Sequence, residues 1–140
     1  MGLSFILCSR KENGIFMKLK NILFVVKDIE KSKKFYREIF GLEVVRDFGE
    51  NVILTEGLVL QECDLWEKCI GENVQMGGRD AELYFEENDL DGFIEKLGGC
   101  DYEIEYLNKC KGNNIGKRAI LIFDPDRHII EIGESYSITS

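Results

Sequence analysis

Residues 21–45 read NILFVVKDIEKSKKFYREIFGLEVV, and this stretch decides the fold. Its apolar opening, residues 19–26, is rich in β-branched and aromatic side chains and is typical of a buried strand. Asp28 then predicts a helix N-cap, because its carboxylate can accept backbone N–H groups of a first turn. Apolar side chains recur at helical spacing over residues 29–40, and Gly41 is the kind of residue that ends a helix. The stretch therefore predicts a strand followed by an amphipathic helix.

The same order of elements returns later in the chain. Residues 81–86 (AELYFE) predict a strand, Asp89 a second N-cap, and residues 90–97 a helix with apolar side chains at positions i, i+3, i+4 and i+7. Asp28 and Asp89 lie 61 positions apart, as do Phe24 and Phe85. Short strands are expected at 42–46, 51–55 and 58–63 after the first helix, and at 102–107, 117–123 and 128–132 after the second.

Two similar βαβββ modules in so short a chain must share a core, because either alone is too small to bury its own sheet face. We therefore expect an α+β fold in which two modules of mixed sheet form a curved cup, with a groove for a small ligand. The expected boundaries are a single domain over 17–140, with modules at about 18–63 and 80–134 and a linker at 64–79. Residues 1–16 are expected to be a peripheral or weakly ordered extension, and the natural start at Met1 or Met17 stays open.

Composition excludes several classes of function. The chain has 140 residues, of which 44% are hydrophobic, and 18 basic against 26 acidic residues give a net charge of −8. Such a surface repels phosphate groups, which argues against nucleic acid and anionic membranes as partners. The five cysteines form no C-x-x-C pair, so we expect reduced thiols in the cytoplasm rather than a zinc ribbon or a disulfide framework.

Two motifs resemble those of the vicinal oxygen chelate superfamily. The opening is similar to its strand, Val-x-Asp-(Ile/Leu)-Glu, Phe-Tyr and Phe-Gly-Leu pattern, and FDPDRHIIEIGE at residues 123–134 is similar to its Phe-x-Asp-Pro-Asp-Gly-Asn-x-(Ile/Leu)-Glu ending. Glyoxalase I, bleomycin- and fosfomycin-resistance proteins and extradiol dioxygenases belong to this group. The resemblance covers residues 18–134 and implies a small organic molecule bound between the two modules.

The resemblance also implies where a divalent metal would bind. By position, its ligands fall on Asn21, Glu82 and Glu131, with a fourth at Leu60 or, one residue later, at Gln61. None is a histidine, so this oxygen set suits Mg²⁺ or Mn²⁺ better than zinc, nickel or iron and argues against dioxygenase chemistry. The implied activity is a metal-dependent lyase or isomerase resembling lactoylglutathione lyase, in which Glu82 and Glu131 serve as catalytic residues that move a proton.

Each candidate residue also has a purely structural interpretation. Glu82 and Glu131 lie among apolar strand neighbours, but strand alternation can turn either side chain to solvent. The candidate substrate-binding aromatics are Trp66, in the linker, and Tyr84, on the face of Glu82; both are also suited to core packing. His128 is the only histidine, and we expect it in a solvent-exposed turn.

Two other functions remain open at this point. The incomplete ligand set favours a metal-free protein that sequesters a drug or metabolite, and an acidic groove would suit a cationic ligand. A partner-binding domain without a ligand is the third possibility. We expect a homodimer, with the modules paired either within one chain or between two chains.

Overall fold

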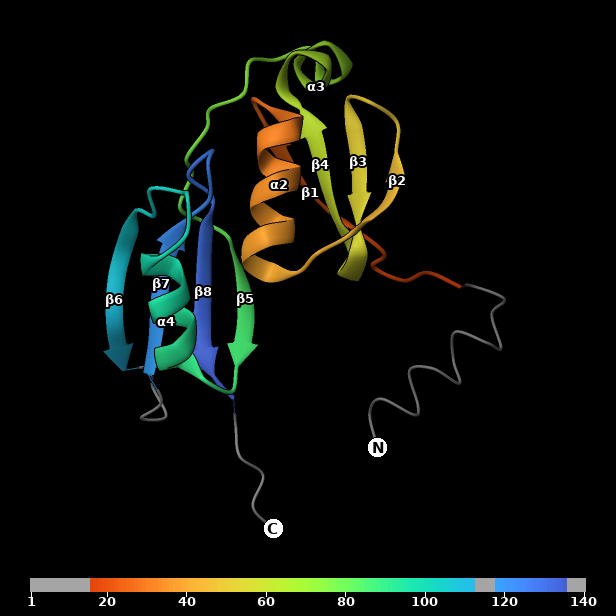
Figure 1. Ribbon diagram of the computed structural model, residues 1–140. Helices are drawn as coiled ribbons and strands as arrows, with labels where there is room; N and C mark the ends of the chain where they lie inside the picture. The colour runs from red at the N-terminus through yellow and green to blue at the C-terminus, as the bar shows by residue number, and fades with distance from the viewer. Residues whose placement is uncertain (1–15, 113–117, 136–140) are drawn as a thin grey trace.

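The computed structural model describes residues 16–112 and 118–135 (Figure 1). The expected extension over 1–16 lies outside this part, apart from Phe16, which is exposed. The first half contains β1 (Ile22–Val26), α2 (Ile29–Phe40), β2 (Val44–Asp47), β3 (Asn51–Leu54), the 3-10 turn η1 (Thr55–Gly57), β4 (Leu58–Glu62) and α3 (Cys63–Ile70). The second half contains β5 (Glu82–Glu87), α4 (Leu90–Gly98), β6 (Tyr106–Gly112), β7 (Arg118–Phe123) and β8 (Ile129–Glu134).

The two halves have the same topology, which confirms the repeat. The first sheet has the strand order β1-β4-β3-β2 and the second the order β5-β8-β7-β6. In each sheet the first strand pairs in parallel with the last, and the other pairs are antiparallel. The α+β class with two four-stranded mixed sheets is therefore confirmed. Within the described residues, no helix is long and apolar enough to span a membrane.

Both sheets contribute to one shared core. Figure 1 shows α2 between the two sheets and α4 crossing β7 and β8. Side chains from both halves form a single buried cluster that includes Tyr36 on α2, Leu60 on β4 and Ile130 on β8. The rings of Phe40 on α2 and Phe85 on β5 stack with centroids 4.3 Å apart, which joins the modules directly. Neither module therefore has a core of its own.

Strand alternation leaves each sheet with a second face, opposite the shared core, which we call its open face. In the second sheet the core takes Leu83 and Phe85 of β5, Ile130 and Ile132 of β8, and Ile120 and Ile122 of β7. Their strand neighbours therefore lie on the open face. These are Glu82, Tyr84 and Glu86 on β5, Ile129, Glu131 and Gly133 on β8, and Ala119, Leu121 and Phe123 on β7.

The local signals at the helix ends are confirmed. The Asp28 carboxylate accepts the Lys31 N–H at 3.1 Å, and the Asp89 carboxylate accepts the Gly92 N–H at 2.9 Å. Gly41 has φ 71°, the left-handed conformation that glycine adopts without a Cβ penalty. These caps fix where each helix leaves its preceding strand.

Two elements differ from expectation. Residues 64–70, expected as linker, form α3 together with Cys63, which was expected to end a strand. The helix begins where the Glu62 carboxylate accepts the Asp64 and Leu65 N–H groups, both at 3.0 Å. The strand expected at 102–107 begins only at Tyr106 and runs to Gly112. Tyr102 and Ile104 instead pack against the shared core, so their apolar character reflects burial rather than strand pairing.

Candidate carboxylate site on the second sheet

Glu82 and Glu131 form a pair of carboxyl groups on the open face of the second sheet. Glu82 lies opposite Ile129 and Tyr84 lies opposite Glu131, so the two glutamates are diagonal neighbours on adjacent parallel strands. Partial burial, the hydrogen bond with Glu131 and the charge of Glu131 together raise the pKa of Glu82 to about 7. Two carboxyl groups so close repel each other when both are ionised, so the pair retains a proton near neutral pH.

The surroundings of this pair are aromatic and apolar. The Tyr84 ring lies across Gly133, where any added Cβ would collide with the ring. Glu131 faces Leu121 across the strand pair on β7. Tyr84 remains 46% exposed, so its ring is accessible to a ligand on this face. The arrangement can hold a cation or a proton at the carboxyl groups and an apolar body beside Tyr84.

Asn21 lies just before β1 in the first sheet, and the structure does not bring it into this pair. Its amide donates to the Gly57 carbonyl at 3.2 Å, across the turn that leads into β4. Of the two alternatives for a fourth ligand, Leu60 is fully buried in the core, whereas Gln61 lies on the open face by strand alternation. Gln61 accepts the Asn51 amide at 2.8 Å. Both amide side chains therefore have partners within the first sheet.

Trp66 lies on α3, which packs against β4 and β1 of the first sheet. Its side chain is half-buried, and the structure places it beside the first sheet rather than on the face of the glutamate pair. Trp66 and Tyr84 therefore lie on different modules, and the structure does not assign them to one ligand site within the chain.

A cavity of about 520 Å³ separates the modules on the helix side. It lies along β5 between the end of α2 and the start of α4, with Phe40, Phe85 and Phe93 among its lining residues. Neither Glu82 nor Glu131 lines it, because both side chains project from the opposite face of the second sheet. The expected groove and the expected site residues therefore occupy different sides of that sheet.

A buried network around Asp124 is the polar feature that sequence reasoning missed. The Asp124 carboxylate accepts the Tyr36 hydroxyl at 2.6 Å and lies 2.8 Å from Nδ1 of His128. The His128 ring also stacks on Phe24 of β1, with centroids 4.1 Å apart. The expectation of an exposed turn histidine is thus wrong: the His128 side chain is only 18% exposed. Two aspartates in an apolar context, as in FDPD, were the available signal for buried carboxylates that need donors.

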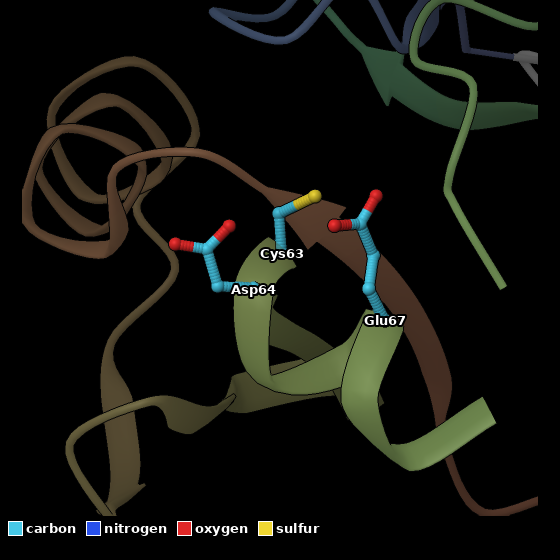
Figure 2. A group of neighbouring side chains, drawn as sticks. All are labelled: Cys63, Asp64 and Glu67. Carbon is cyan, nitrogen blue, oxygen red and sulfur yellow. The ribbon is translucent and has the colours of Figure 1, made fainter. Parts of the chain in front are cut away.

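A second acidic cluster lies in the first turns of α3 (Figure 2). Donor atoms of Cys63, Asp64 and Glu67 lie within 4.8 Å of one another. Burial and the neighbouring carboxylates raise the pKa of the Cys63 thiol, which keeps it in the protonated form that binds metals poorly. Glu67 already accepts the Val74 N–H at 2.8 Å and so fixes the chain after the helix. Contacts within this segment of the chain therefore explain why the three side chains lie together.

The donor set at the glutamate pair fits a hard divalent cation in part. Two carboxylate oxygens are suitable ligands for Mg²⁺ or Mn²⁺, and a cation between them would relieve their mutual repulsion. Magnesium commonly keeps several waters and binds through one or two carboxylates, so two protein ligands are sufficient for that ion. The chain's own residues offer no imidazole here, since His128 is bound to Asp124.

Comparisons with known proteins agree on the family. A family model described as a glyoxalase-like domain matches residues 19–137. The fosfomycin resistance protein FosX of Listeria innocua is 26% identical over 119 residues, covering 81% of this chain and 86% of that protein. A protein of unknown function from Agrobacterium tumefaciens is 33% identical, with a TM-score of 0.74, and the match covers 86% of this chain and 96% of that one. Lactoylglutathione lyase from the same species shares the fold at 21% identity and a TM-score of 0.64, with 86% and 95% covered.

Proposed function

Because the chain belongs to the glyoxalase-like domain family, we propose that it binds a small organic molecule and acts on it as a divalent-metal-dependent lyase or isomerase. The observation that carries this proposal is the pairing of Glu82 with Glu131 on one face of the second sheet. Lactoylglutathione lyase and FosX, to which the chain is similar, support a small-molecule substrate. Asn21 is proposed as a third ligand only if a rearrangement or a second copy of the chain brings it to the pair.

The two glutamates have separable roles in this proposal. A bound Mg²⁺ or Mn²⁺ would polarise adjacent oxygens of the substrate as a Lewis acid. In the metal-free protein burial and Glu131 raise the pKa of Glu82 to about 7. On leaving the metal, the Glu82 carboxylate would accept a proton from a substrate carbon and return it. Glu131, on β8, stays beside Glu82 as the other carboxylate of the pair. Tyr84 offers an aromatic surface for the body of the substrate.

Metal binding is the first test. Titration with Mn²⁺, followed by electron paramagnetic resonance and by the shift in melting temperature, should give a saturable site in the native protein. Glu82→Gln should weaken Mn²⁺ binding at least tenfold, because it removes a charged ligand and leaves a neutral amide. Glu95→Gln, on the exposed side of α4, makes the same chemical change outside the site and should bind Mn²⁺ normally. Equal binding by both variants would reject the metal site.

A metal-free binding protein is the second candidate function. It is favoured by the engagement of Asn21 with Gly57 and of Gln61 with Asn51, which leaves the glutamates as the two available ligands. A carboxyl pair beside an aromatic ring would then suit an organic cation. Melting-temperature screens with benzyltrimethylammonium in the presence of a chelator should show stabilisation that Glu82→Gln abolishes. Stabilisation by Mn²⁺ but not by the organic cation would favour the enzyme.

A further inference from the structure

Two guanidinium groups gather on one aromatic ring at the end of β7. The Arg127 Cζ lies 4.2 Å from the centroid of the Phe123 ring, and the Arg79 Cζ lies 5.6 Å from it. Arg79 comes from the segment that leads into β5, whereas Arg127 belongs to the turn between β7 and β8. These segments run side by side, since a Cβ on Gly77 would lie 3.6 Å from the Cβ of Arg127. Two distant parts of the chain therefore bring their cations to one spot.

The charges at this spot are not balanced within the chain. Arg127 pairs with Glu105, with 2.5 Å between Nη1 and Oε1. In the part of the chain that the structure describes, Glu105 is the one carboxylate within 4.0 Å of either guanidinium. Asp124 and Asp126, in the same turn, are buried and accept hydrogen bonds from other donors. One positive charge thus stays uncompensated in a protein whose net charge is −8.

The arginines lie near the glutamate pair. Phe123 pairs with Ile129, and Ile129 pairs with Glu82, so the three residues form one row across the open face. Adjacent strands are spaced by roughly 4.8 Å, which puts Glu82 about 10 Å from Phe123. A molecule of metabolite size can span that distance. The glutamate pair therefore lies at one end of this row, and the two arginines lie over the Phe123 ring at the other end.

We propose that Arg79 and Arg127 form an anion subsite that holds a carboxylate or phosphate group of the substrate. Guanidinium groups present planar sets of N–H donors that match such oxyanions, and an aromatic ring beneath them fixes their orientation. This inference rests on the proposed function for the role of the glutamate pair. The anion subsite narrows the substrate class to molecules that have oxygen donors at the end bound near the glutamate pair. These molecules would also have an anionic group about two strand spacings from that end.

The subsite is tested without metal, so its outcome is independent of Mn²⁺ binding. Inorganic phosphate and acetate are titrated at constant ionic strength, and the side-chain Nε–H signals of arginine are followed by NMR. We expect saturable shifts for Arg79 and Arg127 but not for Arg46, an exposed arginine on β2 of the first sheet. Arg79→Gln should weaken phosphate binding about tenfold. Arg46→Gln changes the net charge equally and should leave the affinity unchanged.

Each result of the anion titrations either supports the anion subsite or overturns it. A stronger response to phosphate than to acetate assigns the subsite to phospho compounds, and the reverse assigns it to carboxylates. Shifts that rise linearly and equally at all arginines would show non-specific attraction and overturn the subsite. Unchanged phosphate affinity in Arg79→Gln would overturn it as well, with retained melting temperature showing that the variant is folded. Failure of Mn²⁺ binding alone would reject the proposed enzyme and leave this subsite standing.

Discussion

Glu82 shows how a single side chain takes its properties from a neighbour on another strand. Glu82 is exposed on β5, yet partial desolvation together with the hydrogen bond and charge of Glu131 on β8 raises its pKa. Sequence patterning predicted that both residues would be strand glutamates among apolar neighbours. The pattern alone could not predict that they would be paired, because pairing depends on the β5–β8 register, which is set by contacts far apart in the sequence. Only the family resemblance implied that the two glutamates converge.

The raised pKa of Glu82 predicts a pH dependence of stability. Between the ordinary pKa of 4.5 and the folded value of about 7, the folded protein binds more protons at this residue than the unfolded chain does. The free energy of unfolding should therefore fall as pH rises through this range and then level off. In Glu82→Gln this component should be absent, which melting curves from pH 4 to pH 8 will show. Parallel curves for the two proteins would contradict the assignment.

Tyr36 predicts a stability effect of one hydroxyl group. Its hydroxyl donates to the buried Asp124 carboxylate, so Tyr36→Phe leaves that carboxylate with one donor fewer. The free energy of unfolding should drop by about 1–3 kcal/mol in urea denaturation. Tyr102→Phe is the matched control, because the buried Tyr102 hydroxyl has no hydrogen-bond partner in the described structure. That variant should be neutral or slightly stabilising, and an equal loss in both would contradict the role of Asp124.

Helices and strands followed the sequence signals wherever the signal was local. The caps at Asp28 and Asp89 were predictable because each depends on a side chain three residues from its N–H partner. Strand ends were less predictable, since β6 and β8 extend to wherever a neighbouring strand offers partners. Helix α3 was missed because its eight residues are bounded by an unusual cap, Glu62, and by Gly71, a residue that also suits a loop.

The first cap gives a prediction for α2. Asp28→Ala removes the acceptor for the Lys31 N–H and should cost about 1 kcal/mol in the free energy of unfolding. Asp28→Asn retains an oxygen acceptor at the same place and should cost much less. Chemical denaturation of the two variants checks this. A similar loss in both would attribute the effect to charge rather than to the cap.

At the scale of the whole molecule, the helix-covered faces of both sheets close one core, and their open faces project away from it. The duplicated topology could be predicted from the sequence because the two modules repeat at a fixed offset of 61 residues. Their mutual placement could not, because it depends on Phe40 stacking on Phe85 and on α2 reaching Asp124. Those contacts leave no sequence pattern of their own.

Exposed apolar side chains on the first sheet support the expected homodimer. Val44 and Val45 on β2 and Phe48 directly after it are 41%, 59% and 60% exposed, so apolar side chains gather along this edge of the first sheet. Light scattering should therefore give twice the chain mass of 16.1 kDa. Val45→Lys and Phe48→Lys should shift the protein toward the monomer if β2 takes part in the interface. A monomer at all concentrations would contradict the dimer.

The bond from Tyr36 to Asp124 spans 88 positions of the chain and connects one repeat with the other. A duplicated gene often lets its copies drift apart, each free to lose what the other retains. Here that freedom is limited, because the Tyr36 hydroxyl in the first repeat donates the hydrogen bond that the buried Asp124 carboxylate in the second repeat accepts. Among descendants of this protein, we expect positions 36 and 124 to change together or not at all.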